Sequence, residues 1–375
     1  MKKLLLSIFM IVALMSLAAC KGEAKVSEAK EDTKVVEKEK LVIIDQNDRE
    51  VEIPDSINRV ATGRILPFPA VYFLANGSTD EIVGIHPASK SAAKESMLGK
   101  MSPSILEADT SFLNGGELNV EELLRLDTDI VFVYGDNGHK IDVYEKAGIN
   151  AIGIKTMSLF GGDSIETLNS WLELLGEISG NQAKAMEIID YGKEVEADIN
   201  DKLQGIEKVK GLMIFTQTDG KNVVSGKGFF GNYWLNSTGA KDLAEDEIKI
   251  KAVVDMEQIY TWDPEVLYIT NFTSLQPEDF YENKIPGQDW SEVSAVKNKR
   301  VHKIPLGIYR WFPPSGDSPL MLQWLAQKNH PELFDYDMNS VISAYYEKYY
   351  GYSLTEEEIN MILNPSEESA KGYND

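Results

Sequence analysis

The feature that most constrains this chain is a pair of helical segments within residues 163–205. In the second of them, apolar residues recur at steps of three and four from Ile188 to Leu203, which predicts a helix over 181–204 with one buried face. At about 1.5 Å per residue, such a helix spans roughly 36 Å, close to the width of a whole lobe. We therefore interpret 163–205 as a strut between two lobes. An ordinary long helix inside a single α/β domain is the alternative.

An internal repeat favours two lobes. The segment NVEELLRLDTDIVFVYG (119–135) aligns without a gap with DMEQIYTWDPEVLYITN (255–271), and the strut lies between the two copies. Both copies begin with an N-cap residue, continue as a short helix, turn at an aspartate and end as a buried strand. The predicted fold class is therefore α/β: two similar Rossmann-like lobes joined by a long helical strut, with a ligand cleft between them.

The N-terminal residues predict export and lipid attachment. Two lysines precede an apolar run over 4–17, and the sequence LAAC over 17–20 resembles the lipobox of bacterial lipoproteins. Cys20 is the single cysteine of the chain, so no intrachain disulfide is expected. The lipobox implies cleavage before Cys20 and a lipid-anchored protein on the extracytoplasmic face of the cell membrane. An ordinary secretory signal or a short membrane anchor is the alternative.

The predicted organisation is a lipoprotein signal peptide (1–19), a charged tether (20–40), an N-terminal α/β lobe (41–162), the helix pair (163–205) and a C-terminal α/β lobe with terminal helices (206–375). Within the first lobe, residues 88–117 are polar and irregular, and we expect a loop with one helical turn there.

Charge and motifs exclude several classes of function. The formal net charge of −23 argues against nucleic acid as a partner, because phosphate binding needs a basic surface. The four histidines show no metal-ligand spacing, and the chain lacks the nucleophile elbow, the phosphate-binding loop and the dinucleotide fingerprint. The motif search thus favours a protein that is not an enzyme and that needs no cofactor or directly bound metal, although a catalytic pair of carboxylates stays open in so acidic a chain.

Arginine placement indicates an anionic ligand. Ligands of parallel α/β sheets bind beyond the carboxyl ends of the strands, so the loops after those strand ends are the candidate positions. Only six arginines accompany 31 lysines, yet Arg64 and Arg310 fall in such loops, one in each lobe. The guanidinium fork suits a carboxylate or an oxyanion, although a structural role for either residue is the alternative.

Aromatic residues fall in the same loops and would shape a pocket for a bulky ligand. Phe312 belongs to this group, and core packing is the alternative for Trp234 because that residue lies inside a predicted helix. The candidate ligand-binding residues are Arg64, Tyr134, Phe229, Trp234, Tyr309, Arg310 and Trp311.

Taken together, the chain resembles the substrate-binding lipoproteins of bacterial ABC importers, in the class that takes ferric siderophores, vitamin B12 and haem. The resemblance rests on GGELNVEELLRLDTDIVFV, SIETLNSWLELLGEISG, the SGKG turn and PSGDSPLMLQWLAQKNHPELF. It implies that Glu121 and Glu257, equivalent in the repeat, meet arginines of an ABC permease, and that a monomer closes only modestly around its ligand. Stabilisation of the helix dipole is the alternative role for these glutamates.

The expected ligand is an iron chelate, most simply an anionic ferric siderophore. A molybdate or tungstate oxyanion, cobalamin and haem are alternatives within the class, and a surface enzyme such as a hydrolase or an adhesin-like lipoprotein is the alternative outside it. Pocket volume discriminates among the ligands. A bulky chelate needs roughly 300–1,000 Å³, whereas an oxyanion needs far less.

Overall fold

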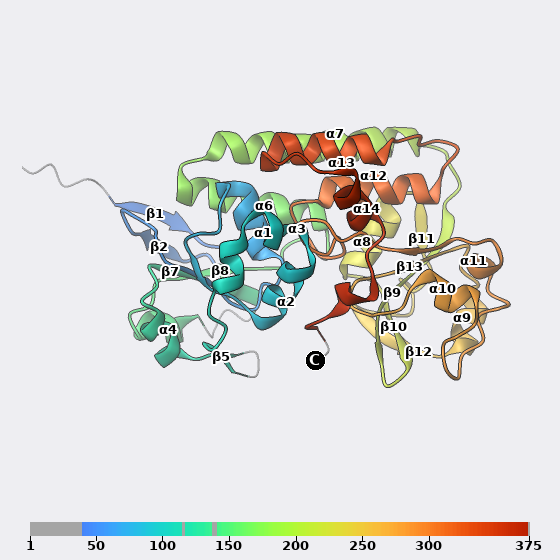
Figure 1. Ribbon diagram of the computed structural model, residues 1–375, viewed down its shortest axis with the longest axis horizontal. Helices are drawn as coiled ribbons and strands as arrows, with labels where there is room; N and C mark the ends of the chain where they lie inside the picture. The colour runs from blue at the N-terminus through green and yellow to red at the C-terminus, as the bar shows by residue number, and fades with distance from the viewer. Residues whose placement is uncertain (1–39, 115–116, 137–140, 374–375) are drawn as a thin grey trace, which may run out of the picture. The chain divides into compact units, whose positions relative to one another are not determined.

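The computed structural model describes residues 40–114, 117–136 and 141–373, and the chain from Lys40 onward forms one compact unit (Figure 1). Two sheets organise this unit, one built from residues 60–154 and the other from residues 209–303, with helices packed around both. The predicted α/β fold with two lobes is confirmed.

The first lobe contains the strands β1 (Leu41–Ile44), β2 (Glu50–Ile53), β3 (Val60–Thr62), β4 (Ile82–Gly84), β5 (Leu113–Asn114), β6 (Glu117–Leu118), β7 (Ile130–Tyr134) and β8 (Ala151–Ile154), and the helices α1 (Phe68–Asn76), α4 (Val120–Leu126) and α5 (Asp142–Lys146). Its main sheet is parallel throughout, in the order β4-β3-β7-β8. The central strand β7 is buried because its sequence, IVFVY, is apolar on both faces. The hairpin β1-β2 is antiparallel.

The second lobe contains β9 (Val209–Thr218), β10 (Lys221–Ser225), β11 (Ala240–Asp242), β12 (Lys251–Val254), β13 (Val266–Ile269) and β14 (Val301–Lys303), with α8 (Phe230–Ser237), α9 (Met256–Trp262), α10 (Pro277–Tyr281) and α11 (Ser294–Lys297). The strand order is β12-β10-β9-β13-β14, and β11 also pairs with β9. Strands β11, β13 and β14 run parallel in their pairings, whereas β10 and β12 are antiparallel. The sheet is therefore mixed, which the sequence analysis did not anticipate.

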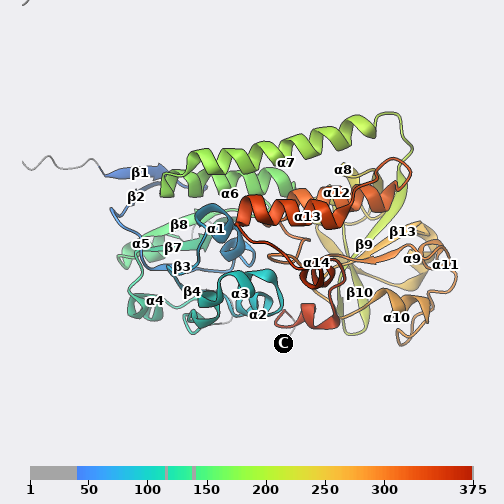
Figure 2. The same ribbon diagram turned by 45° about the horizontal axis from the view of Figure 1, so that its top comes forward.

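The chain ends in α12 (Ser318–Asn329), α13 (Met338–Tyr345), the π-helical turn η3 (Tyr346–Tyr350), α14 (Glu356–Leu363) and η4 (Glu367–Ala370). The predicted strut is formed by α6 (Ser164–Ser179) and α7 (Gln182–Lys202). In Figure 2, α7 lies along α6 and α12. Helix α6 packs on the first lobe, where Trp171 meets Phe68 edge-on at 5.8 Å, and α7 packs on the terminal helices through Tyr191 and Tyr345 at 5.6 Å. The helix pair is thus packed against elements on both sides.

The internal repeat is visible in the structure. The path β3-α4-β7-α5-β8 has the same strand pairing as β9-α9-β13-α11-β14. The N-caps Asn119 and Asp255 both accept backbone N–H groups of the helix they precede. At the other end, Asp127 (φ 50°) and Asp263 (φ 42°) both adopt the left-handed conformation that ends a helix. The two copies therefore share their caps as well as their topology.

The prediction of a mainly irregular segment over 88–117 was wrong. This segment contains α2 (Pro87–Glu95), α3 (Met97–Met101) and the 3₁₀ turn η1 (Pro103–Glu107). The His86 ring Nδ1 accepts the Ala88 N–H at 3.1 Å and caps α2, with Pro87 at the first helical position. Small residues give α2 no clear apolar period, and burial of Ala92 and Ala93 holds it in place. No helix within the described ranges is long and apolar enough to cross a membrane.

Candidate ligand-binding site

A cavity of about 160 Å³ lies where the strand ends of the two lobes meet. First-lobe residues come from the loops after β3 and β8 and from the end of β7, and second-lobe residues come from β9 and from the loops before α8 and after β13 and β14. This is the position that the parallel-sheet rule predicts. The lining residues are Arg64, Ile65, Leu66, Pro67, Tyr134, Thr156, Met157, Trp171, Phe215, Phe229, Phe230, Phe272, Tyr309, Phe312, Pro313, Pro314 and Tyr373.

An aromatic cluster forms the second-lobe side of this cavity. The Phe215 ring lies at its centre, with ring centroids at 5.0 Å from Phe272, 5.2 Å from Phe229 and 5.4 Å from Phe312. These are contact distances for offset or edge-on aromatic pairs. The cluster gives the cavity a stiff apolar wall that keeps water away from polar groups behind it.

Arg310 lies behind this wall and is fully buried. Its Cζ is 4.8 Å from the Phe272 ring centroid and 5.8 Å from the Tyr309 ring centroid. The Nε and Nη2 groups donate to the carbonyls of Ser369 and Lys371. Neither Nη1 nor the Tyr309 hydroxyl has a hydrogen-bond partner of normal geometry, and no carboxylate of the described residues forms an ion pair with Arg310. Within the described part of the chain, this buried cation therefore has no counter-ion.

Other cations accompany Arg310. Lys251 Nζ lies 4.4 Å from the Phe215 ring centroid, and burial lowers the pKa of this lysine. Burial also lowers the pKa of Lys303 to about 7, and the nearby charge of Arg310 adds to this effect. Positive charge therefore gathers around the aromatic cluster, in a protein whose formal net charge is −23.

Arg64 lies at the same cavity but is exposed. Burial raises the pKa of the Tyr134 hydroxyl, and the charge of Arg64 opposes that rise. For Tyr373, burial raises the pKa, and both Arg310 and Arg64 oppose it. Because both guanidinium groups act on one phenol, Arg64 and Arg310 lie around the same space rather than on opposite sides of the molecule.

A buried carboxylate fixes the loop that carries Tyr309 and Arg310. Asp317 accepts the Ile308 N–H at 2.7 Å and the Trp311 indole N–H at 2.8 Å, and it also accepts the hydroxyls of two tyrosines of η3. Gly307 is required beside it, because a Cβ there would lie 1.9 Å from Asp317 Oδ2. The loop is therefore set by interactions on its far side from the cavity.

The structure brings four of the predicted ligand residues to the cavity lining, namely Arg64, Tyr134, Phe229 and Tyr309, and places Arg310 directly behind it. It does not bring Trp234 and Trp311 there. Both are fully buried, and their indole N–H groups donate to the Phe312 carbonyl and to Asp317. These two residues support the loop after β14 and do not line the cavity.

Several lining residues were missed by the sequence analysis. Phe215 lies inside β9. Phe272 lies three residues beyond the end of β13, so the strand-end rule applied to every aromatic residue would have found it. Thr156 and Met157 follow β8 in the same way. No local pattern indicates Tyr373, because its place at the cavity depends on the path of the C-terminal segment.

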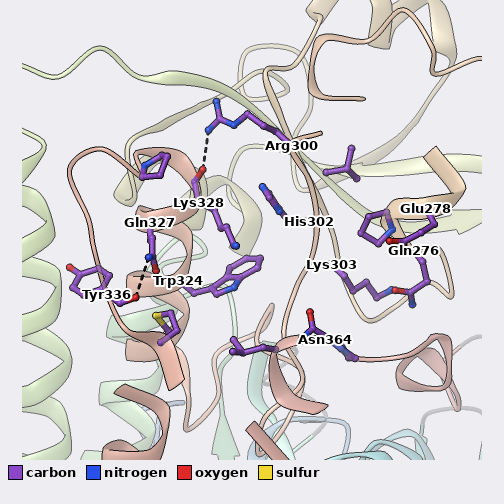
Figure 3. Close-up of a pocket in the computed structure, with 16 residues that line it drawn as sticks. Gln276, Glu278, Arg300, His302, Lys303, Trp324, Gln327, Lys328, Tyr336 and Asn364 are labelled. Carbon is purple, nitrogen blue, oxygen red and sulfur yellow. Dashed lines mark hydrogen bonds between the residues drawn. The ribbon is translucent and has the colours of Figure 1, made fainter. Parts of the chain in front are cut away.

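A larger cavity of about 820 Å³ lies between β14, α12 and the loops before α10 and after α14, all on the second-lobe side of the strut (Figure 3). Two of its cations are already engaged, since Arg300 donates to the carbonyls of Lys328 and Asn329, and Lys303 donates to three backbone carbonyls. The third, Lys328, lies with its Nζ 5.8 Å from the Trp324 ring centroid. Burial lowers the pKa of His302 there to about 3. We therefore regard the smaller cavity, which both lobes line, as the ligand site.

Glu121 and Glu257 lie in the first turns of α4 and α9, and both are exposed. Cys20 lies outside the described residues. Within those residues, no group of three or more His, Cys, Asp or Glu side chains is arranged to hold a metal ion.

Two α/β lobes joined by a helix pair, with an aromatic cavity where their strand ends meet, are the architecture of substrate-binding proteins that serve ABC importers. A model of the family described as periplasmic binding protein matches residues 67–306, and the chain belongs to this family. The family resemblance predicted from the sequence is confirmed.

Relatives and solved structures agree with this assignment. A periplasmic solute-binding protein from Veillonella parvula DSM 2008 is 32% identical with a TM-score of 0.78, over 86% of this chain and 96% of that one. The molybdate-binding protein MolA of Haemophilus influenzae is 24% identical over 336 residues, 82% of this chain and 90% of MolA, and its molybdate-bound structure gives a TM-score of 0.69. An uncharacterized ABC transporter substrate-binding lipoprotein of Bacillus subtilis, YvrC, is 24% identical over 303 residues, 79% of this chain and 87% of that protein. Such proteins bind substrates for transporters and are not enzymes.

Proposed function

We propose that this protein captures a compact oxyanion of the molybdate or tungstate type and delivers it to an ABC permease. The observation that carries the proposal is Arg310, a fully buried cation next to the cavity whose Nη1 has no hydrogen-bond partner of normal geometry and which has no counter-ion among the described residues. A buried charge without a partner is unfavourable. An anion that enters the cavity is therefore attracted to the Arg310 guanidinium, which the protein itself leaves without a counter-ion within the described residues.

Cavity volume separates the ligands that the sequence left open. The space of about 160 Å³ is similar to a cavity of ~150 Å³ that holds benzene in another protein. A tetrahedral oxyanion fits this space together with water. A ferric siderophore, cobalamin or haem needs roughly 300–1,000 Å³, so the predicted iron chelate would require a wider cleft. The molybdate-binding relative MolA also favours the oxyanion.

The polar groups around the cavity suit an oxyanion. Tyr309 lines the cavity next to Arg310, and the exposed guanidinium of Arg64 lies at the first-lobe side of the cavity. No carboxylate lines the cavity among the described residues, and Asp136, which lies behind the lining residue Thr156, is held by hydrogen bonds from Thr156 and Ser158. The aromatic wall excludes water, which strengthens each charge interaction inside.

Titration of the protein with a ligand panel tests this function. Trp171 lines the cavity, so its fluorescence reports occupancy. We expect saturable responses to molybdate and tungstate and none to ferric siderophores, haemin or cobalamin. Replacing Arg64 with Ala should weaken oxyanion binding, whereas the matched control Arg125→Ala, on an exposed arginine paired with Glu122 and Asp109, should not. Saturable binding of a ferric chelate without any response to molybdate would contradict the proposal.

We further propose that Glu121 and Glu257 dock the two lobes onto the permease. Their equivalence in the repeat and their exposure at the starts of α4 and α9 support this role, since both would meet basic groups of a partner in the same way.

We also propose that Cys20 carries a lipid and anchors the protein, as a monomer, to the extracytoplasmic face of the membrane. The lipoprotein relative YvrC supports this. Cys20→Ser should move the protein from the membrane fraction to the soluble fraction and abolish incorporation of labelled fatty acid. Unchanged labelling of the variant would exclude Cys20 as the attachment site.

A further inference from the structure

The C-terminal segment Glu367–Tyr373, which begins with η4, lies between α2 of the first lobe and the strands of the second lobe in both ribbon views (Figures 1 and 2). On the second-lobe side, the Asn271 side-chain amide donates to Ser369 Oγ at 3.3 Å. On the first-lobe side, η4 packs against α2. The segment therefore bridges the two lobes, and its last described residue, Tyr373, lines the cavity.

The same segment holds Arg310 in place. The carbonyl of Ser369 accepts from Nε at 3.1 Å and from Nη2 at 3.0 Å, and the carbonyl of Lys371 accepts from Nη2 at 2.9 Å. Three of the hydrogen bonds that orient the buried guanidinium thus come from the last residues of the described chain. Movement of the segment would change both the position and the hydration of this charge.

Tyr373 extends from the segment into the cavity lining. Its ring meets Phe272 edge-on at 4.5 Å and Phe215 at 5.8 Å. Burial raises the pKa of its hydroxyl, although Arg310 and Arg64 oppose the rise. The Tyr373 hydroxyl therefore stays protonated at neutral pH and can donate a hydrogen bond. The charges of both Arg310 and Arg64 act on this hydroxyl.

Gly372 fixes the approach of the segment to α2. Its φ is +78°, and a Cβ at this position would lie 2.1 Å from Ser91 Cβ of α2. Glycine is therefore required twice over, for its backbone conformation and for its close contact with Ser91.

We propose that Tyr373 is a ligand-contacting residue, and that Glu367–Tyr373 is a strap that closes the cavity by joining α2 to Arg310. This inference rests on the proposed role of the cavity as the ligand site. The strap adds a phenolic donor to the oxyanion and slows its escape, and release of the strap opens the site without movement of the lobes.

The test uses the full mature protein with sodium molybdate as probe, and it measures affinity by calorimetry and dissociation by stopped-flow fluorescence. Tyr373→Phe keeps the ring and removes the donor, so affinity should fall about tenfold, the effect of one hydrogen bond to a charged group. Tyr352→Phe is the matched control, because that half-buried tyrosine donates to Glu358 away from the cavity. Unchanged affinity in both Tyr373→Phe and Tyr373→Ala would overturn the assignment.

The strap is tested with Gly372→Ala, which should raise the dissociation rate several-fold. Gly205→Ala is the matched control, because Gly205 has a similar φ of +76° with open space around it, so it carries the backbone strain without the clash. Hydrogen exchange gives a readout independent of the ligand: the Ser369 and Lys371 amides, bonded to Ser366 and Glu368 in the structure, should lose protection in Gly372→Ala only. Equal protection in both variants would overturn the strap.

Failure of the wild-type protein to bind molybdate would overturn the oxyanion function, and the hydrogen-exchange result would still decide whether the strap exists.

Discussion

Replacement of Arg310 by glutamine tests the electrostatic basis of the site. The guanidinium carbon lies 5.8 Å from the ring centroid of Tyr309, a lining residue, and we take a similar separation, about 6 Å, for an anion in the cavity. With an effective dielectric constant of ~20, a unit charge pair at ~6 Å is worth about 3 kcal/mol. Arg310→Gln should therefore weaken molybdate binding roughly 100-fold.

Two further variants separate charge from structure. Arg310→Lys keeps the charge but loses the fork, so it should retain more affinity than the glutamine variant. Arg300→Gln is the matched control, because Arg300 also donates to two backbone carbonyls but lies in the larger cavity away from the ligand. Loss of those bonds should lower the free energy of unfolding by ~1–3 kcal/mol without changing affinity.

The assay is isothermal titration of molybdate at a temperature where circular dichroism shows each variant to be folded. An affinity of Arg310→Gln within threefold of the wild type, with the C-terminal segment still protected from hydrogen exchange, would refute the electrostatic reasoning.

Three other predictions concern the exposed charge of Arg64, the docking glutamates and the N-cap of α6. Arg64→Ala should weaken molybdate binding at low ionic strength and have a smaller effect in 0.5 M salt, because the Arg64 charge is exposed and screened; an equal effect at both salt concentrations would place Arg64 inside the desolvated site. Reversal of Glu121 and Glu257 to lysine should abolish uptake in cells and leave molybdate affinity intact, and a loss of affinity would show a structural role. Burial raises the pKa of Asp163, the N-cap of α6, from 3.8 to about 6. Between about pH 4 and 6, the native state therefore binds more protons at this group than the unfolded state does. The stability that this group contributes is lost as the pH rises through that window. Asp163→Asn keeps the cap and should raise the free energy of unfolding at pH 7 by about 1 kcal/mol, after allowance for solvent screening, but not at pH 4; urea denaturation at both pH values measures this, and equal effects at both would contradict it.

The strut and the repeat were predictable because their signals are local. The apolar period of α7 predicts a helix directly from the sequence. Asn119 and Asp255 indicate the starts of α4 and α9, because each places a side-chain oxygen before an apolar run. Helix α2 escaped prediction because alanine and serine give it almost no apolar contrast. Its burial under the first lobe, which no local pattern encodes, decides its structure.

The site was predictable only in part, for a physical reason. The strand-end rule selects loops, but it does not say which side chains of a loop face the cavity. Tyr309 and Trp311 are two residues apart, yet one lines the cavity and the other donates to the buried carboxylate of Asp317. Likewise, Arg64 is exposed and Arg310 is fully buried, although both follow a strand. Such differences arise from contacts with distant segments.

The contacts of the helix pair favour ligand entry by local movement rather than by rotation of the lobes. The helix pair is packed on α1 through Trp171 and on the terminal helices through Tyr191, so rotation of one lobe against the other would break buried aromatic contacts. The aromatic wall of the cavity is similarly interlocked around Phe215. By contrast, the C-terminal segment is held by a few hydrogen bonds and one half-buried ring, so its opening needs the least free energy. A ligand anion partly neutralises the Arg310 charge, so in this proposal the hydrogen bond from the Tyr373 hydroxyl to the anion favours the closed strap after capture.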